Sequence, residues 1–250
     1  AKGGQTFEEG DEISVYAWTG DATVAPETRE RVVNNAINKL TNGSWVSTPQ
    51  MLWKNNRDKH YFIGVYPISA ISDLSAGEYT FDVNKQTESD LLVAVNKDGL
   101  SYNVDEQQPV PLTFTHVMAK LAVNLTYKNQ WGGIPTVEKV VVGNAAKEAT
   151  INYLTKVVTP STTAKEDFSL PEITENTKYV SVIIPQEEVT QLTIVIGGKN
   201  FVYDNGTPFK LESGKITTVN LEVGRDEIKL GDVKITNWED GSTFSGEALN

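Results

Sequence analysis

Few side chains in this sequence are of the types that carry out chemistry. It contains two histidines, His60 and His116, and no cysteine. Each histidine stands beside a stretch rich in aromatic or apolar residues, where a lone imidazole is more often a hydrogen-bonding group than a catalyst. The sequence has no HExxH, GxSxG, Walker A or GxGxxG pattern. These observations predict no catalytic residue and a protein that is not an enzyme.

Acidic residues are the next candidates, because a glycosidase needs two facing carboxylates. Four acidic pairs fall at predicted strand ends or turns, where acids are usually solvated: Asp11-Glu12, Glu187-Glu188, Asp226-Glu227 and Glu239-Asp240. Another set of oxygen donors lies in one loop but lacks the register and glycine of an EF-hand: Asp82, Asn84, Glu88 and Asp90. The sequence therefore predicts no metal site and no cofactor.

Tryptophan rings are the main candidates for stacking on a carbohydrate. Four of the five lie in or next to predicted strands, where a large ring packs into a core: Trp18, Trp45, Trp53 and Trp238. Trp131 stands in the glycine-rich stretch 130–135 and is the tryptophan expected to be exposed. Trp131 is therefore the candidate residue for ligand stacking.

Composition excludes several classes of protein. The chain has 250 residues and a formal net charge of −11, with no basic stripe, so we predict no nucleic-acid partner. Its hydrophobic content of 39% fits a globular protein. No apolar run approaches the roughly 18 residues that span a bilayer. The length suits one large or two ordinary domains.

Alternation of apolar and polar residues is the main structural pattern. Leu121, Val123 and Leu125 share one face of a stretch whose other face is polar, which is typical of a half-buried strand. By the same criteria, strands are predicted at 11–18, 45–47, 50–53, 61–66, 91–95, 110–115, 137–142, 151–154, 180–184, 192–196, 201–203, 216–223, 228–230 and 233–238. Gly197-Gly198 predicts a tight hairpin turn. Residues 155–178 are predicted to be a long loop or an edge excursion.

One segment has the spacing of a helix. Pro26 suits a first turn, and Glu27 and Glu30 favour the positive end of a helix dipole. Apolar residues then recur at helical spacing from Val32 to Leu40, and Gly43 follows as a terminator. This pattern predicts a short helix between two of the strands.

Many short strands separated by turn residues predict an all-β protein built from β-sandwiches. The number of strands exceeds one sandwich, so two domains are predicted. We place the boundary at the change of direction at His116-Val117, giving domains 1–117 and 118–250. The stretch 130–135 is the alternative linker.

Several segments in order resemble the fimbrillin-like proteins of Bacteroides and related bacteria. They are Tyr61–Pro67, Ser89–Ala94, Leu112–Val123, Gly214–Leu221 and Ile235–Gly241. The resemblance implies two transthyretin-like β-sandwich domains, here with one short helix in the N-terminal domain. It also implies a lipoprotein of the outer membrane and cell surface, with a signal peptide and lipid anchor upstream of residue 1.

The resemblance further implies assembly into fimbriae by exchange of β-strands with other subunits. A protease would remove a first strand, here about residues 11–18, by cleavage at Arg29 or Arg31, and a donor strand would fill the groove. Within the predicted helix, these arginines would be hard for a protease to reach. The closing strand, with Val233, Ile235 and Trp238, is either a donor or this chain's own last strand. The tail 239–250 offers only Phe244, Ala248 and Leu249 as apolar anchors and is predicted to be a poor donor.

The leading hypothesis is therefore a tip, accessory or stalk subunit of fimbriae that supports adhesion. The alternative is a surface lipoprotein that does not polymerise and binds glycan or host protein, for which exposed aromatic residues such as Trp131 would be required. A hydrolase on a β-sandwich scaffold comes last, because catalytic motifs are missing.

Overall fold

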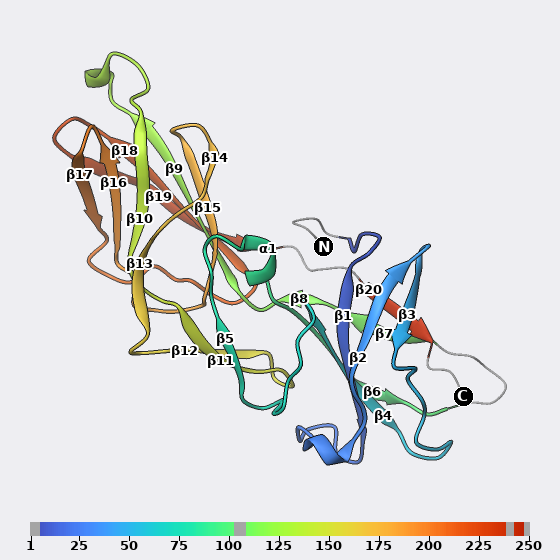
Figure 1. Cartoon of the computed structure of the whole chain (residues 1–250). Coiled ribbons are helices and arrows are strands. Elements are labelled where there is room, and N and C mark those ends of the chain that lie inside the picture. The colour runs from blue at the N-terminus through green and yellow to red at the C-terminus, as the bar shows by residue number, and fades with distance from the viewer. Residues whose placement is uncertain (1–5, 103–108, 239–242, 248–250) are drawn as a thin grey trace.

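The strands gather in two lobes that meet at a narrow junction (Figure 1). The computed structural model describes residues 6–102, 109–238 and 243–247. The first lobe, called the N-terminal sandwich, contains a six-stranded sheet in the order β3-β2-β1-β4-β6-β8. Its strands are β1 (Glu12–Thr19), β2 (Arg31–Thr41), β3 (Ser44–Thr48), β4 (His60–Tyr66), β6 (Leu92–Leu100) and β8 (Thr115–His116).

A second layer lies across one face of this sheet. It contains β7 (Pro109–Thr113), which pairs with β20 (Thr243–Glu247) from the other end of the chain. Figure 1 shows β20 in red beside β7 and β3, although most of the preceding strands lie in the other lobe. The core between the layers is formed by buried residues of both, including Val15, Phe62, Leu112 and Phe114.

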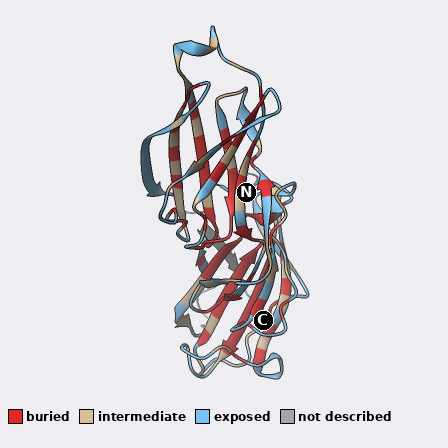
Figure 2. Ribbon diagram, turned by 90° about the vertical axis from the view of Figure 1, so that its left-hand side faces the viewer, coloured by how far each residue is buried: buried red, intermediate tan, exposed pale blue. Residues whose placement is uncertain are grey.

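The second lobe, called the C-terminal sandwich, packs a five-stranded sheet (β14-β15-β9-β18-β19) on a four-stranded sheet (β13-β10-β16-β17). The five are β9 (Ala119–Tyr127), β14 (Glu172–Thr174), β15 (Lys178–Ile183), β18 (Lys215–Val223) and β19 (Ile228–Asn237). The four are β10 (Val137–Ala146), β13 (Lys165–Ser169), β16 (Gln191–Ile196) and β17 (Lys199–Asp204). Figure 2 shows buried residues along the strands of both lobes.

A small three-stranded sheet connects the lobes. It contains β12 (Val157–Pro160), β11 (Glu148–Asn152) and β5 (Gly77–Thr80), so a segment of the first half pairs with the second half. The helical elements are short: α1 (Gln86–Ser89), η1 (Thr28–Glu30) and η2 (Asn129–Trp131). Within the described residues no helix is long and apolar enough to cross a membrane.

The predicted all-β sandwich fold is confirmed. The tight turn at Gly197-Gly198 is also confirmed, because it joins β16 to β17 and both glycines have positive φ, +57° and +71°. Within 155–178, β12, β13 and β14 are short strands at sheet edges, in line with an edge excursion. The boundary at 117/118 stays a prediction, and β5 and β20 each pair with a strand on the other side of it.

The predicted helix between Pro26 and Gly43 is wrong, and so is the predicted strand at 50–53. Residues 31–41 form β2, which pairs with β1 on one side and β3 on the other. The register shifts so that Val15 faces Ala36 while Ala17 faces Val33. Asn35 takes a left-handed φ of +56° in this bulge. The bulge places two buried residues three apart and so imitates helical spacing.

Candidate functional site: a strand-accepting edge in the N-terminal sandwich

β7 and the residue after it, Phe114, lie close against the six-stranded sheet because every second side chain points at that sheet. Val110, Leu112 and Phe114 are fully buried, whereas Pro109, Pro111 and Thr113 are exposed. The approach is tight at Gly64 of β4, where a Cβ atom would lie only 2.6 Å from the Phe114 ring. A side chain at this position would therefore push β7 away from the sheet.

The two prolines make β7 a strand with one usable edge. Alternate residues of a strand direct their N–H and C=O groups to opposite edges, and proline has no N–H. Asn96 of β6 donates a hydrogen bond to the Pro111 carbonyl oxygen at 3.2 Å, so the proline edge faces β6. The other edge, with the N–H groups of Val110 and Leu112, is the one that can pair with a further strand.

β20 occupies that usable edge. The two strands run antiparallel, from Thr243 opposite Thr113 to Glu247 opposite Pro109. β20 belongs to the tail that was predicted to be a poor donor, and the structure shows that its backbone does complete the N-terminal sandwich. Ala248 and Leu249 of that tail, and the acidic pair Glu239-Asp240, lie outside the described residues.

The N-terminal segment covers the same core beside these strands. The Phe7 ring packs edge-on against Trp45 and Phe114, each with ring centroids 5.2 Å apart, and against Tyr66 at 5.6 Å. The layer opposite the six-stranded sheet thus includes β7, a strand from the end of the chain and a segment from its beginning.

The predicted removable strand is not an edge strand. β1 lies in the middle of the six-stranded sheet, pairs with β2 and β4, and buries every residue between its two ends. One face contributes to the core under β7, and the other, with Tyr16 and Trp18, contributes to the core shared with the C-terminal sandwich. Removing residues 11–18 would therefore divide the sheet, and proteolytic removal of this strand stays a prediction.

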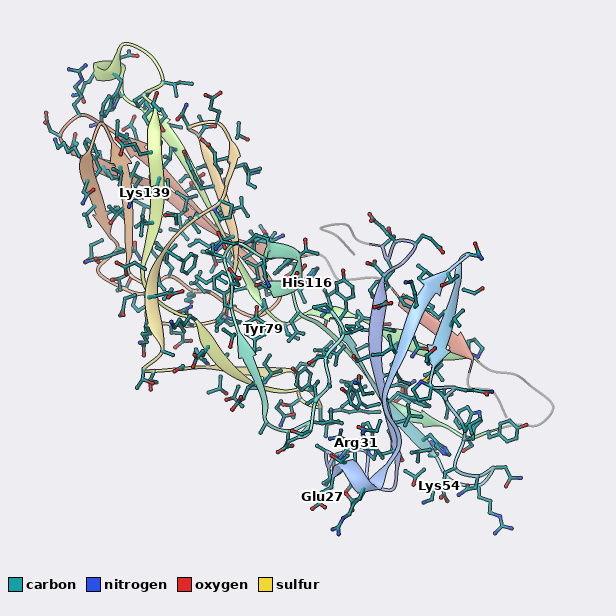
Figure 3. All side chains as sticks on the ribbon, in the orientation of Figure 1. Glu27, Arg31, Lys54, Tyr79, His116 and Lys139 are labelled. Carbon is teal, nitrogen blue, oxygen red and sulfur yellow. The ribbon has the colours of Figure 1, made fainter. Side chains whose placement is uncertain are left out.

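The two predicted processing residues lie in different surroundings. Arg29 is in η1, in the loop between β1 and β2, and its side chain is 80% exposed. Arg31 is buried, and its guanidinium donates to the carbonyl oxygens of Ile71 and Ser72, each at 2.8 Å. Arg31 begins β2 at the end of the lobe where Glu27 and Lys54 also lie (Figure 3). Of the two side chains, that of Arg29 is the more exposed, and processing at either residue stays a prediction.

Trp131, the predicted stacking residue, is half-buried at the far end of the C-terminal sandwich. Its indole N–H donates to the Val223 carbonyl oxygen at 2.9 Å, and the Arg225 guanidinium lies 5.7 Å from its ring centroid. Phe201 contacts the ring with centroids 5.9 Å apart. The structure therefore gives Trp131 a packing role, and ligand stacking on it stays a prediction.

Among the residues that the structure describes, the remaining candidates do not form a metal-binding cluster. Within the described ranges, no three His, Cys, Asp or Glu side chains are grouped to hold a metal ion. The predicted donors Asp82 and Asp90 have other partners, since Asp82 accepts from the Asn84 backbone and Asp90 contacts His116. A cavity of about 590 Å³ lies beside β12 and β13, but its lining contains no aromatic residue and its Lys165 is paired with Glu188.

The two histidines serve different local structures. His60 Nδ1 lies 3.0 Å from the Asp58 carbonyl oxygen, and its Nε2 accepts the Lys54 backbone N–H at 3.0 Å. Burial lowers the pKa of this imidazole. His116 instead lies at the junction of the lobes (Figure 3), where it contacts Asp90 and Trp238. His60 fits the predicted strand-end role, whereas the contact of His116 with Trp238 has no signal in the local sequence.

Comparison with known proteins agrees with this architecture. The model of the fimbrillin-like family matches residues 1–238, and the chain belongs to that family. A search of curated protein sequences finds no match. Among solved structures, a candidate cell adhesion protein from Bacteroides uniformis is similar at 20% identity, with a TM-score of 0.73 over 95% of each chain.

Two further solved structures share the fold. A candidate cell adhesion protein from Bacteroides ovatus has 18% identity and a TM-score of 0.67, over 93% of this chain and 89% of that one. The tip fimbrial protein Mfa3 from Porphyromonas gingivalis, with a C-terminal truncation, has 11% identity and a TM-score of 0.58, over 92% and 95%. The family assigns the chain a structural, non-enzymatic role as a fimbrial subunit at the cell surface, in association with other subunits.

Proposed function

We propose that this chain is a tip, accessory or stalk subunit of surface fimbriae that joins a neighbour by accepting a β-strand along β7. One observation supports this most directly: the usable edge of β7 is filled by a strand from the distant end of the chain. An edge that accepts β20 within one molecule offers the same backbone groups and the same apolar core to a strand from another molecule.

The physical basis is the state of β7 when no strand lies beside it. The N–H groups of Val110 and Leu112 would lose their partners, and the core beneath Leu112 and Phe114 would be less well covered. Each backbone hydrogen bond that is lost costs about 0.5–1.5 kcal/mol. The edge is therefore expected to bind a strand whenever one is available, from this chain or from another.

The proposal includes processing at Arg29 and attachment to the outer membrane through a lipid anchor upstream of residue 1. The exposed Arg29 side chain supports the first of these. Because β1 pairs on both sides, we expect cleavage there to open the β1–β2 loop while β1 stays in the sheet. Brief treatment with an arginine-specific protease should cut at Arg29 and leave the two fragments associated in size-exclusion chromatography.

Strand acceptance can be tested with a chain that ends at Trp238 and a labelled peptide of residues 239–250. The N–H groups of Val110 and Leu112 point at β20. In an antiparallel pair, the N–H groups of their partners Gly246 and Phe244 therefore point back at β7. The N–H group of Ser245, which lies between these two partners, points away from β7. A peptide with Gly246→Pro should bind more weakly, by roughly two- to tenfold, because it loses a hydrogen bond in the pairing.

A peptide with Ser245→Pro is the matched control, since it carries the same proline one residue away. We expect it to bind like the original peptide in fluorescence anisotropy. Equal binding of the two proline peptides would contradict the register, and no binding of any peptide would contradict strand acceptance.

Binding of glycan or host protein through Trp131 is a separate prediction, which a glycan array of the native chain and of Trp131→Leu would test.

A further inference from the structure

Trp238 is held in place immediately before the C-terminal tail. It follows β19, is 8% exposed, and its ring stacks on the His116 imidazole with centroids 3.8 Å apart and planes at 11°. The Lys120 ammonium lies 4.0 Å from the centroid of the Trp238 ring. His116, at the junction of the lobes in Figure 3, therefore marks the point at which the tail leaves the C-terminal sandwich.

Further contacts fix the groups around Trp238. Asp90 Oδ1 lies 2.7 Å from His116 Nδ1, and both side chains are nearly buried. The Trp238 backbone N–H donates to the Gly214 carbonyl oxygen at 2.9 Å. Gly214 has a φ of +69°, and a Cβ atom there would lie 3.1 Å from the His116 carbonyl oxygen. The ring and the backbone of Trp238 are therefore both anchored; we call Asp90, His116, Lys120 and Trp238 the anchor cluster.

The anchor cluster is connected to the strand-accepting edge by two short pieces of chain. On one side, residues 113–116 run from the end of β7 to His116; on the other, residues 238–243 run from Trp238 to β20. Thr113 and Thr243 are paired, so the stack and the strand pair together close a small loop. The segment from Trp238 to Thr243 spans at most about 18 Å. A tether this short holds β20 at the β7 edge at an effective concentration in the millimolar range.

We infer that the anchor cluster keeps the C-terminal strand in its own N-terminal sandwich, and that loosening the cluster frees the β7 edge for the strand of a second copy. The second part of this inference rests on the proposed function; the first does not. His116, Lys120 and Asp90 are positioning residues here, since they act on β20 through Trp238. Aromatic stacking and the cation–π contact add to simple burial of the ring.

Hydrogen exchange of the β7 amides in the full chain measures how often β20 is paired with β7, because the two strands form one sheet. In Trp238→Leu, which keeps an apolar side chain but loses the stack, the Val110 and Leu112 amides should exchange about tenfold faster than in the native chain. Trp238→Phe retains an aromatic ring and should restore most of the protection. His116→Gln removes the stacked ring from the other side, and should give the same increase in exchange even if Trp238→Leu folds poorly.

Trp131→Leu is the matched control, because it removes another packed tryptophan with a cation near its ring, at the far end of the C-terminal sandwich. It should leave β7 exchange unchanged. Equal β7 exchange in Trp238→Leu, His116→Gln and the native chain would overturn the inference, as would an equal increase in Trp131→Leu. A third outcome separates this inference from the proposed function. If β7 exchanges faster in the Trp238 and His116 variants but no tail peptide binds a chain ending at Trp238, the role of the anchor cluster is supported. Strand acceptance from another subunit is then contradicted.

Discussion

The two sandwiches differ in where their second layer comes from. Both sheets of the C-terminal sandwich are formed by residues 119–237, in one continuous stretch of chain. The N-terminal sandwich has a six-stranded sheet from residues 12–116, opposed by β7, by the segment around Phe7 and by β20 from the end of the chain. The C-terminal sandwich is therefore formed by one continuous stretch of chain, whereas the N-terminal sandwich also includes a strand from the distant end of the chain.

The two faces of the six-stranded sheet are therefore expected to have different roles. The other face of the six-stranded sheet, with Tyr16, Trp18 and Ile63, packs into the core that it shares with the C-terminal sandwich. We therefore expect that face to hold the two lobes together when β20 is absent. Exchange of the last strand is thus expected to open one layer of one sandwich while the rest of the molecule stays folded.

The largest expected effect is from removal of one core ring in each sandwich. Phe114→Ala and Phe209→Ala each remove a side chain that is at most 2% exposed, and each should lower the free energy of unfolding by about 3–5 kcal/mol. Phe114 packs against Phe7 and over Gly64, so its loss should also release β7 and β20. Denaturant titration checks the first effect and hydrogen exchange of β7 the second. Similar exchange of β7 in the two variants would remove the distinction between the sandwiches.

A smaller effect is expected where the layers approach most closely. A Cβ atom at Gly64 would lie 2.6 Å from the Phe114 ring, so Gly64→Ala should destabilise the N-terminal sandwich by about 1–3 kcal/mol. Gly143, in β10 of the C-terminal sandwich, is the matched control. A Cβ atom there would lie 3.6 Å from Gln191 Cβ, which is ordinary contact. Gly143→Ala should be neutral or slightly stabilising in thermal denaturation, and a cost equal to that of Gly64→Ala would contradict the tight approach.

The sequence predicts strands well where apolar and polar residues alternate without interruption, as at Leu121–Leu125. It fails at β2, because the bulge at Asn35 places Val33 and Ala36 three residues apart on the buried side. A helix and a bulged strand share this spacing, and they differ in long-range pairing with β1 and β3, which has no local signal. The same limitation applies to the predicted detachable first strand, since its central place in the sheet follows from pairing on both sides.

The strand-accepting edge is only partly visible in the sequence. The alternation of Pro109 and Pro111 with Val110 and Leu112 indicates a strand that can pair on one edge, and this signal is local. That β20 takes the edge depends on a contact across more than a hundred residues of chain. The stack of His116 on Trp238 is equally distant, so no spacing rule relates the two rings.

The smallest expected effect concerns pH and again distinguishes the sandwiches. Burial lowers the pKa of His60, and its Nε2 accepts the Lys54 N–H, a bond that protonation would break. Because the folded pKa lies below the ordinary value of 6.5, the unfolded chain takes up the proton first. The contribution of His60 is therefore complete above pH 6.5 and is lost as the pH falls through the folded pKa.

The free energy of unfolding should fall less on acidification in His60→Gln, which keeps an acceptor but does not titrate. The native chain and His60→Gln have the same carboxylates, so the difference between the pH profiles of the two proteins isolates His60. NMR titration of the His60 signal should place its midpoint below 6.5. Parallel pH profiles, or a His60 midpoint at or above 6.5, would show that acid does not act on the N-terminal sandwich through this residue.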